Sequence, residues 1–104
     1  MIIKVKGKDQ EGVQGKLEAV MIVDIQTDGK VSEKNNRLRV SDASFATMRV
    51  ASATNFVNYQ DVSGNAMQKA QAAMDNALKT SVVDDIRKHS EIYAKQYNRV
   101  SLNL

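Results

Sequence analysis

The segment at residues 16–26 limits the possible folds more than any other part of the sequence. Its letters, KLEAVMIVDIQ, predict a strand because apolar residues alternate along it. Val20 and Ile22 are apolar in the middle of one face. The other face is apolar along its length, with Leu17, Ala19, Met21, Val23 and Ile25. A strand that is apolar on both faces needs cover on both sides, so we expect protein layers above and below it.

Tight-turn signals predict further antiparallel strands around this one. Asp28 and Gly29 suit a type I′ hairpin turn, so a strand at residues 30–33 is expected to fold straight back. Asn35 and Asn36 tolerate left-handed backbone geometry and predict the next turn. Alternation then predicts strands in RLRVSDA and SFATMRVASATN, with the opening IIKVK as a candidate edge strand. Short strands joined by tight turns indicate an antiparallel β-meander of four to five strands.

The hydrophobic period changes to that of a helix after residue 65. The stripe of the first predicted helix comprises Met67, Ala70, Met74, Ala77 and Leu78. Asn65 is in the position of an N-cap, and several alanines make this helix slim enough to lie close to a sheet. Asp84 and Asp85 favour the start of a second helix, at the positive end of its dipole. The predicted inner stripe of that helix comprises Ile86, Ser90, Tyr93 and Tyr97, with His89 beside it.

Together these patterns predict an α+β fold. Residues 1–56 form the sheet, 57–64 a connecting loop and 65–104 two helices packed on that sheet, in one compact unit. The length of 104 residues suits one domain with one core. No run of about 18 apolar residues is present that would span a membrane. The first residues also lack the apolar run of a secretory signal, so we expect no export signal within them.

The sequence offers little material for catalysis. Cysteine is absent, the single His89 cannot build a histidine-rich metal site, and the common nucleotide and zinc-protease motifs are missing. Asp84 and Asp85 are adjacent and point about 100° apart on a helix, which indicates a helix start rather than a catalytic carboxylate pair. The 15 basic and 12 acidic residues are spread over both halves of the chain, unlike a nucleic-acid interface. We therefore expect no catalytic, cofactor or metal site, and no nucleic-acid or membrane partner.

Three stretches together resemble one region of the bacterial α-L-fucosidases of glycoside hydrolase family 95. The first is ASATNFVNYQDVSGN at residues 51–65, and the second is the alanine-rich helix after it. The third is the ending, with His89, Tyr93, Tyr97 and Arg99 followed by VSL. The upstream TDGKVSEKNNRLRVSDA is also similar to the last hairpin of that family's sandwich domain. The resemblance spans about residues 14–104.

This resemblance implies the end of an N-terminal β-sandwich domain plus the helical linker that leads to a catalytic (α/α)6 barrel. Most partner strands of that sandwich are missing from this sequence. Phe56 is then expected to be a buried anchor between strand and linker. Asn55, Asn58 and Asp61 are expected to hydrogen-bond to the loop backbone. The family's catalytic residues lie in the barrel, so none is assigned to a position here.

The implied function is that of a non-catalytic structural fragment. Its parent would hydrolyse α-L-fucosyl linkages of glycans in the periplasm or outside a bacterial cell. The barrel of the parent would be its partner, and fucosylated glycan would be bound only through the parent. The alternatives lack enzymatic activity: a carbohydrate-binding module that uses Tyr59, or a protein-interaction domain. An open sheet edge invites pairing, so the isolated fragment is a candidate homo-oligomer.

Overall fold

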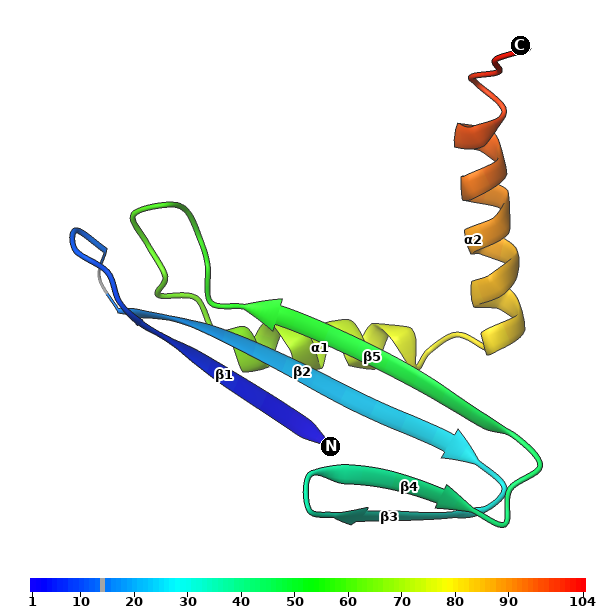
Figure 1. Ribbon diagram of the computed structural model, residues 1–104, viewed down its shortest axis with the longest axis horizontal. Coiled ribbons are helices and arrows are strands. Elements are labelled where there is room, and N and C mark those ends of the chain that lie inside the picture. Colours follow the sequence, from blue (N-terminus) through cyan, green and yellow to red (C-terminus); the bar gives the residue numbers. More distant parts are fainter. Residues whose placement is uncertain (14) are drawn as a thin grey trace.

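The chain forms five strands followed by two helices, which confirms the predicted α+β class (Figure 1). The computed structural model describes residues 1–13 and 15–104. The strands are β1 (Ile2–Asp9), β2 (Lys16–Thr27), β3 (Lys30–Lys34), β4 (Arg37–Ser41) and β5 (Ala46–Thr54). The helices are α1 (Ala66–Ala77) and α2 (Val82–Tyr97). No helix in these described ranges is long and apolar enough to cross a membrane.

The strand pairing differs from a simple meander. One antiparallel sheet has the order β1-β2-β5, whereas β3 and β4 pair only with each other. The prediction of a type I′ turn at Asp28 and Gly29 was wrong: neither residue has the positive φ that this turn requires, and β3 leaves β2 rather than folding straight back along it. Next to the turn, β5 occupies one edge of β2 as far as Thr27, whereas β1 pairs with the other edge only as far as Ile22. Asp28 accepts hydrogen bonds from the backbone N–H groups of Ser44 and Phe45, just before β5, and these bonds hold the base of the hairpin beside β5 instead of closing a turn back onto β2.

Helix α1 covers one face of the three-stranded sheet and lies behind the strands in Figure 1. Val20 and Ile22 of β2 and Ala51 of β5 form the sheet side of the core. The helix contributes residues four apart, Ala66, Ala70 and Met74. As predicted, Asn65 is the N-cap, and its side chain accepts a hydrogen bond of 3.0 Å from the backbone N–H of Gln68. The small alanines let the helix axis approach the sheet closely.

The other face of this sheet is apolar and uncovered. Its residues follow from the register, in which Ile3 is opposite Met21 and Val23 is opposite Val50. We give the name open sheet face to these nine apolar residues: Ile3, Val5, Leu17, Ala19, Met21, Val23, Ile25, Met48 and Val50. The uncharged polar residues Thr27, Ser52 and Thr54 lie on the same side of the sheet. Val5 is 61% exposed and Met48 is 65% exposed. No described residue packs a second layer on this face, so the cover expected there for β2 is not supplied by the described part of the chain.

Helix α2 differs from the expectation that both helices pack on the sheet. It begins at Val82, with Ser81 as the N-cap, and none of its residues is buried. Figure 1 shows it rising steeply away from the sheet. The radius of gyration is 18.5 Å, compared with about 13 Å for a compact domain of 100 residues. The molecule is therefore not compact: its extents are 48 × 47 × 29 Å, with α2 and the β3–β4 hairpin extending from the central sheet (Figure 1).

One arginine holds the start of α2 to the sheet. Arg49 of β5 donates hydrogen bonds of 3.0 Å to the side chain of Gln26 and to the carbonyl of Thr80. Its guanidinium also lies 3.7 Å from the carboxylate of Asp85 in the first turn of α2. The Arg49 side chain is only 12% exposed, so this contact is better shielded than an ordinary surface ion pair. Arg49 thus fixes where α2 begins, whereas the body of the helix has no support.

The close approach of α1 to the sheet gives the first prediction. Ala70 is fully buried between the helix and the strands, so Ala70→Leu is expected to lower the free energy of unfolding by about 1–3 kcal/mol through overpacking. Urea denaturation followed by circular dichroism measures this change. Ala73→Leu, at an exposed position of the same helix, is the matched control and should change stability by less than about 0.5 kcal/mol. Equal effects of the two substitutions would contradict the packing described here.

Candidate functional site

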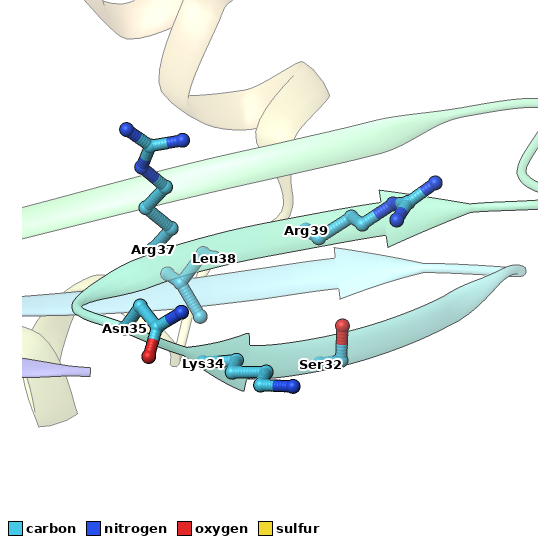
Figure 2. Close-up of a pocket in the computed structure, with 6 residues that line it drawn as sticks. All are labelled: Ser32, Lys34, Asn35, Arg37, Leu38 and Arg39. Atoms are coloured by element: carbon cyan, nitrogen blue, oxygen red, sulfur yellow. The ribbon is translucent and has the colours of Figure 1, made fainter.

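A shallow hollow of about 690 Å³ lies on the β3–β4 hairpin (Figure 2). Figure 2 shows Arg37 and Arg39 projecting from β4, with Leu38 directed away from Arg37. The hollow is lined by Ser32, Lys34, Asn35, Arg37, Leu38 and Arg39. Three of these six side chains are cationic and none is acidic, so the hollow is suited to an anionic group.

Strand alternation explains why these cations lie together. In the hairpin register, Lys34 is opposite Arg37, Ser32 is opposite Arg39 and Lys30 is opposite Ser41. Directly opposite residues share a face of a sheet, so these six residues form one surface, which we call the cationic hairpin face. The intervening residues Val31, Glu33, Leu38 and Val40 lie on the other face.

The turn of the hairpin fixes this register. Asn35 and Asn36 have φ of 53° and 57°, which confirms the predicted left-handed turn residues. A two-residue turn of this type joins the strands so that its flanking residues pair directly. Here these residues are Lys34 and Arg37, two like charges placed opposite each other, an arrangement that destabilises a sheet. The pairing therefore does not serve hairpin stability.

The cationic hairpin face has little internal charge compensation. Lys30 lies 3.8 Å from the carboxylate of Asp42, and both side chains are largely exposed. Within the described ranges, Lys34, Arg37 and Arg39 have no carboxylate within ion-pair distance. Counting charge over each half of the sequence missed this cluster. The cluster becomes visible once the strands are paired. The basic residues at positions 30 and 34 of β3 and at 37 and 39 of β4 then lie on the same face of the hairpin.

Asp28 ties the base of the hairpin to the main sheet. Its carboxylate accepts hydrogen bonds from the Ser44 hydroxyl, from the Ser44 backbone N–H at 3.0 Å and from the Phe45 backbone N–H at 3.3 Å. The Ser44 hydroxyl is the main cause of a pKa of Asp28 below its usual value, and the two backbone N–H groups lower this pKa further. The neighbouring Thr27 hydroxyl donates to the Phe45 carbonyl at 2.6 Å. These bonds link the segment that leaves β2 to the segment that enters β5.

Asn55 closes the ladder between β5 and β2. Its side-chain oxygen accepts from the Glu18 N–H at 2.8 Å, and its side-chain nitrogen donates to the Lys16 carbonyl at 2.8 Å. Its own backbone N–H donates to the Glu18 carbonyl at 3.0 Å. The amide side chain thus continues the pairing that a further strand residue would make. The prediction for Asn55 was right in that its side chain bonds to backbone groups, but these belong to β2 and not to the loop.

The loop after Asn55 is held by its polar residues, as predicted. The Asn58 side chain accepts from the Gln60 N–H at 2.9 Å, and that of Asp61 accepts from the Ser63 N–H at 2.8 Å. The prediction for Phe56 was wrong: it is 50% exposed rather than a buried anchor, because Asn55 already makes the junction and Val62 supplies the buried apolar contact. Tyr59 is 78% exposed at the loop tip, where it is accessible to a ligand.

The aromatic residues of α2 form a ladder on the helix surface. The ring centroids of His89 and Tyr93 are 6.3 Å apart, and those of Tyr93 and Tyr97 are 5.8 Å apart. Tyr93 and Tyr97 are 59% and 68% exposed, and Ile86 is 61% exposed. The stripe predicted to face inward is therefore exposed, since α2 leaves the sheet. Arg99 is also exposed and lies just beyond the helix end.

The described residues contain no cluster of histidine, cysteine or carboxylate side chains with the arrangement of a metal site. The residues singled out from the sequence lie in two separate places. Asn55, Phe56, Tyr59 and Asp61 belong to the loop between β5 and α1, whereas His89, Tyr93 and Arg99 belong to α2 and the segment after it. Comparison with models of protein families and with curated proteins found no match to this chain.

The two hydrogen bonds between the Asn55 side chain and the backbone of Lys16 and Glu18, which we call the amide clamp, give the second prediction. Asn55→Ala is expected to lower the free energy of unfolding by about 1–2 kcal/mol, because the backbone groups of Lys16 and Glu18 both lose a partner. Chemical denaturation measures this loss. The control is Asn58→Ala, which removes one exposed loop hydrogen bond and should cost about 0.5 kcal/mol. An Asn55→Ala protein no less stable than the control would show that the clamp contributes nothing.

Proposed function

We propose that this chain is a non-catalytic structural segment of a glycoside hydrolase similar to the α-L-fucosidases of family 95. In this proposal the three-stranded sheet belongs to the end of a β-sandwich domain, and α1 and α2 form the linker to a catalytic barrel. The parent would hydrolyse α-L-fucosyl linkages of glycans in the periplasm or outside a bacterial cell. The observation that carries the proposal is the open sheet face.

The open sheet face has the composition of an interior surface. None of its nine residues is charged, although 26% of the whole chain is charged. Burying one large apolar side chain contributes about 1.5–3 kcal/mol, so covering Met21, Met48 and Val50 would be strongly favourable. Two stacked sheets pack about 10 Å apart with their apolar faces in contact. A second sheet is therefore the cover that best fits this face.

The polar junctions support a role as a connector between two larger bodies. Asn55 fixes the exit of the chain from the sheet. Arg49 fixes the start of α2 against that same sheet. The helix then presents its row of Ile86, His89, Tyr93 and Tyr97 without any contact to its own domain. Such a row suits packing against a further domain, as the linker of the proposed parent requires.

The open sheet face leads to the third prediction. The chain alone is expected to self-associate with increasing concentration, because the exposed apolar face lowers its free energy by packing on a second copy. Sedimentation velocity over a concentration series measures this association. Val50→Lys places a charge in the face and should weaken association about tenfold or more. Val83→Lys, at an exposed apolar position on α2, should leave it nearly unchanged. A wild-type chain that stays monomeric throughout the series would contradict the proposed role of this face.

The fourth prediction tests the parent enzyme directly. The coding sequence around these residues is read, and the longer product is expressed and assayed on an α-L-fucosyl substrate beside the chain alone. The longer product is expected to release fucose, whereas the chain alone should give the rate of the blank because it lacks a catalytic constellation. Turnover by the chain alone, or flanking sequence that encodes no barrel, would overturn the proposal.

A second candidate is a carbohydrate-binding module, favoured by the 78% exposure of Tyr59. An exposed aromatic ring at a loop tip can stack on a sugar. The same preparations separate the two candidates. Binding of fucosylated oligosaccharide by the chain alone, lost in Tyr59→Ala, would favour the module over the structural segment.

A further inference from the structure

We propose that the β3–β4 hairpin is a docking site for an extended acidic segment of a partner protein, which adds to the outer edge of β4 and places its carboxylates on the cationic hairpin face. This interaction is independent of the proposed glycosidase parent. It rests on the charge, the spacing and the open backbone edge of the hairpin.

The spacing of the cations matches that of an extended peptide. Arg37 and Arg39 are two residues apart on β4 and lie on one face, so their origins are about 6.8 Å apart along the strand. An added strand with acidic residues at alternate positions repeats at the same interval. Each carboxylate would then lie beside one arginine as a cross-strand pair of opposite charge, an arrangement that stabilises a sheet. The planar guanidinium fork of arginine is also suited to binding both oxygens of a carboxylate.

The backbone of β4 has an unused edge. The two-stranded sheet contains only β3 and β4. In the described part of the chain, no backbone hydrogen bond joins residues 30–41 to another segment. Since Lys34 and Arg37 flank a two-residue turn, they form a hydrogen-bonded pair, and the main-chain groups of Leu38 and Val40 point to the outer edge. A peptide strand supplies the donors and acceptors that this edge lacks.

The open edge decides between a peptide and other polyanions. A sulfated glycan or a nucleic acid would satisfy the charge of Lys34, Arg37 and Arg39, but neither has a peptide backbone to pair with Leu38 and Val40. The like-charge pair of Lys34 and Arg37 is unfavourable in the free chain, and a carboxylate placed beside Arg37 on the outer side of β4 offsets part of that repulsion. An acidic strand uses both features, so it fits this surface better than a polyanion that uses only the charge.

Strand β1 can be compared with β4 as a possible binding site for the same acidic segment. It is also an edge strand and also carries cations at alternate positions, Lys4, Lys6 and Lys8. There, however, Lys6 lies 3.7 Å from Glu18, and Asp9 lies at the end of the same strand, 3.8 Å from Lys16. Of these three lysines, only Lys6 has a carboxylate within ion-pair distance in the described part of the chain, since Asp9 pairs with Lys16 of β2. The difference from the hairpin is therefore chiefly that the β1 lysines lack the fork geometry of arginine.

The experiment titrates the whole chain into fluorescently labelled synthetic peptides of about eight residues, the length of an ordinary strand. One peptide alternates glutamate with threonine, a second has the same composition with its glutamates contiguous, and a third has glutamine in place of glutamate. Anisotropy is measured at about 0.05 M salt, where screening is moderate. The alternating peptide should bind about tenfold more tightly than the contiguous one, and the glutamine peptide should show no binding. Amide resonances of Leu38 and Val40 should shift on binding.

Matched variants locate the binding. Arg37→Gln with Arg39→Gln should weaken binding of the alternating peptide about tenfold. Lys6→Gln with Lys8→Gln removes the same charge from β1 and should change it less than twofold; Lys4 is left unchanged because it lines a hollow together with Glu33 and Asn36 of the hairpin. Arg37→Lys with Arg39→Lys keeps the charge without the fork. It should weaken binding about threefold, and it replaces the glutamine variant if that variant fails to fold. Because these positions lie outside the open sheet face, Val50→Lys should leave peptide binding unchanged.

Three results would overturn the proposal. Equal affinity for the alternating and contiguous peptides would show that strand spacing is not recognised. Equal weakening by the β1 variant would show a non-specific charge effect. Tighter binding of a sulfated oligosaccharide or of single-stranded DNA than of the alternating peptide, at the same salt concentration, would assign the cationic hairpin face to a different class of partner.

Discussion

The structure depends on β2, a strand that is apolar on both faces and paired on both edges. Its pairing with β1 and β5 creates the only sheet of more than two strands in the described chain. One of its faces, with Val20 and Ile22, is buried under α1 and gives the core. Its other face is apolar over a longer stretch, from Leu17 to Ile25, but has no cover from the described part of the chain. The same alternation of apolar residues therefore builds the core on one side of β2 and leaves an exposed apolar face on the other. A second layer of protein would bury that face.

Three polar side chains direct the segments that leave this sheet. Asp28 bonds the exit of β2 to the entry of β5 and so sets the base of the hairpin. Asn55 ends the β5 ladder by replacing backbone pairing with its amide. Arg49 joins the sheet to the start of α2. Each of them satisfies main-chain groups at a point where regular pairing stops, and such groups are costly to leave without partners. The directions of the hairpin, the loop and the second helix follow from these contacts.

The open, non-compact shape places three chemically different surfaces on different elements. The open sheet face is uncharged and apolar, the cationic hairpin face is basic, and α2 carries a ladder of aromatic rings. In a compact domain of this size, such surfaces would compete for burial against one another. Here each remains accessible on its own element. This arrangement supports the proposal that the chain contacts other protein domains through these surfaces.

The sequence by itself determined the local conformations. Alternation and period identified the five strands and two helices, the two asparagines identified the hairpin turn, and Asn65 identified the start of α1. Those features depend on residues close together in the chain, whose preferences act whatever the rest of the fold does. The polar role of Asn58 and Asp61 was also predictable, because short amide and carboxylate side chains bond to nearby backbone. The partners of Asn55 lie in β2, far away in the sequence, and only the fold identifies them.

Only the tertiary structure decided which of these elements meet. The detachment of β3 from β2 follows from the long-range pairing of β2 with β5 and from the bonds of Asp28 to Ser44 and Phe45, which a pattern of turns does not encode. The exposure of Phe56 and of the α2 stripe depends on what lies opposite them, and an apolar stripe looks the same whether or not its partner is within the chain. The cationic hairpin face arises only when the register places Arg37 opposite Lys34. Burial and charge clustering depend on which segments lie next to each other. The sequence therefore determined which faces of each element are apolar or charged, and the packing of the elements determined which of these faces stay exposed.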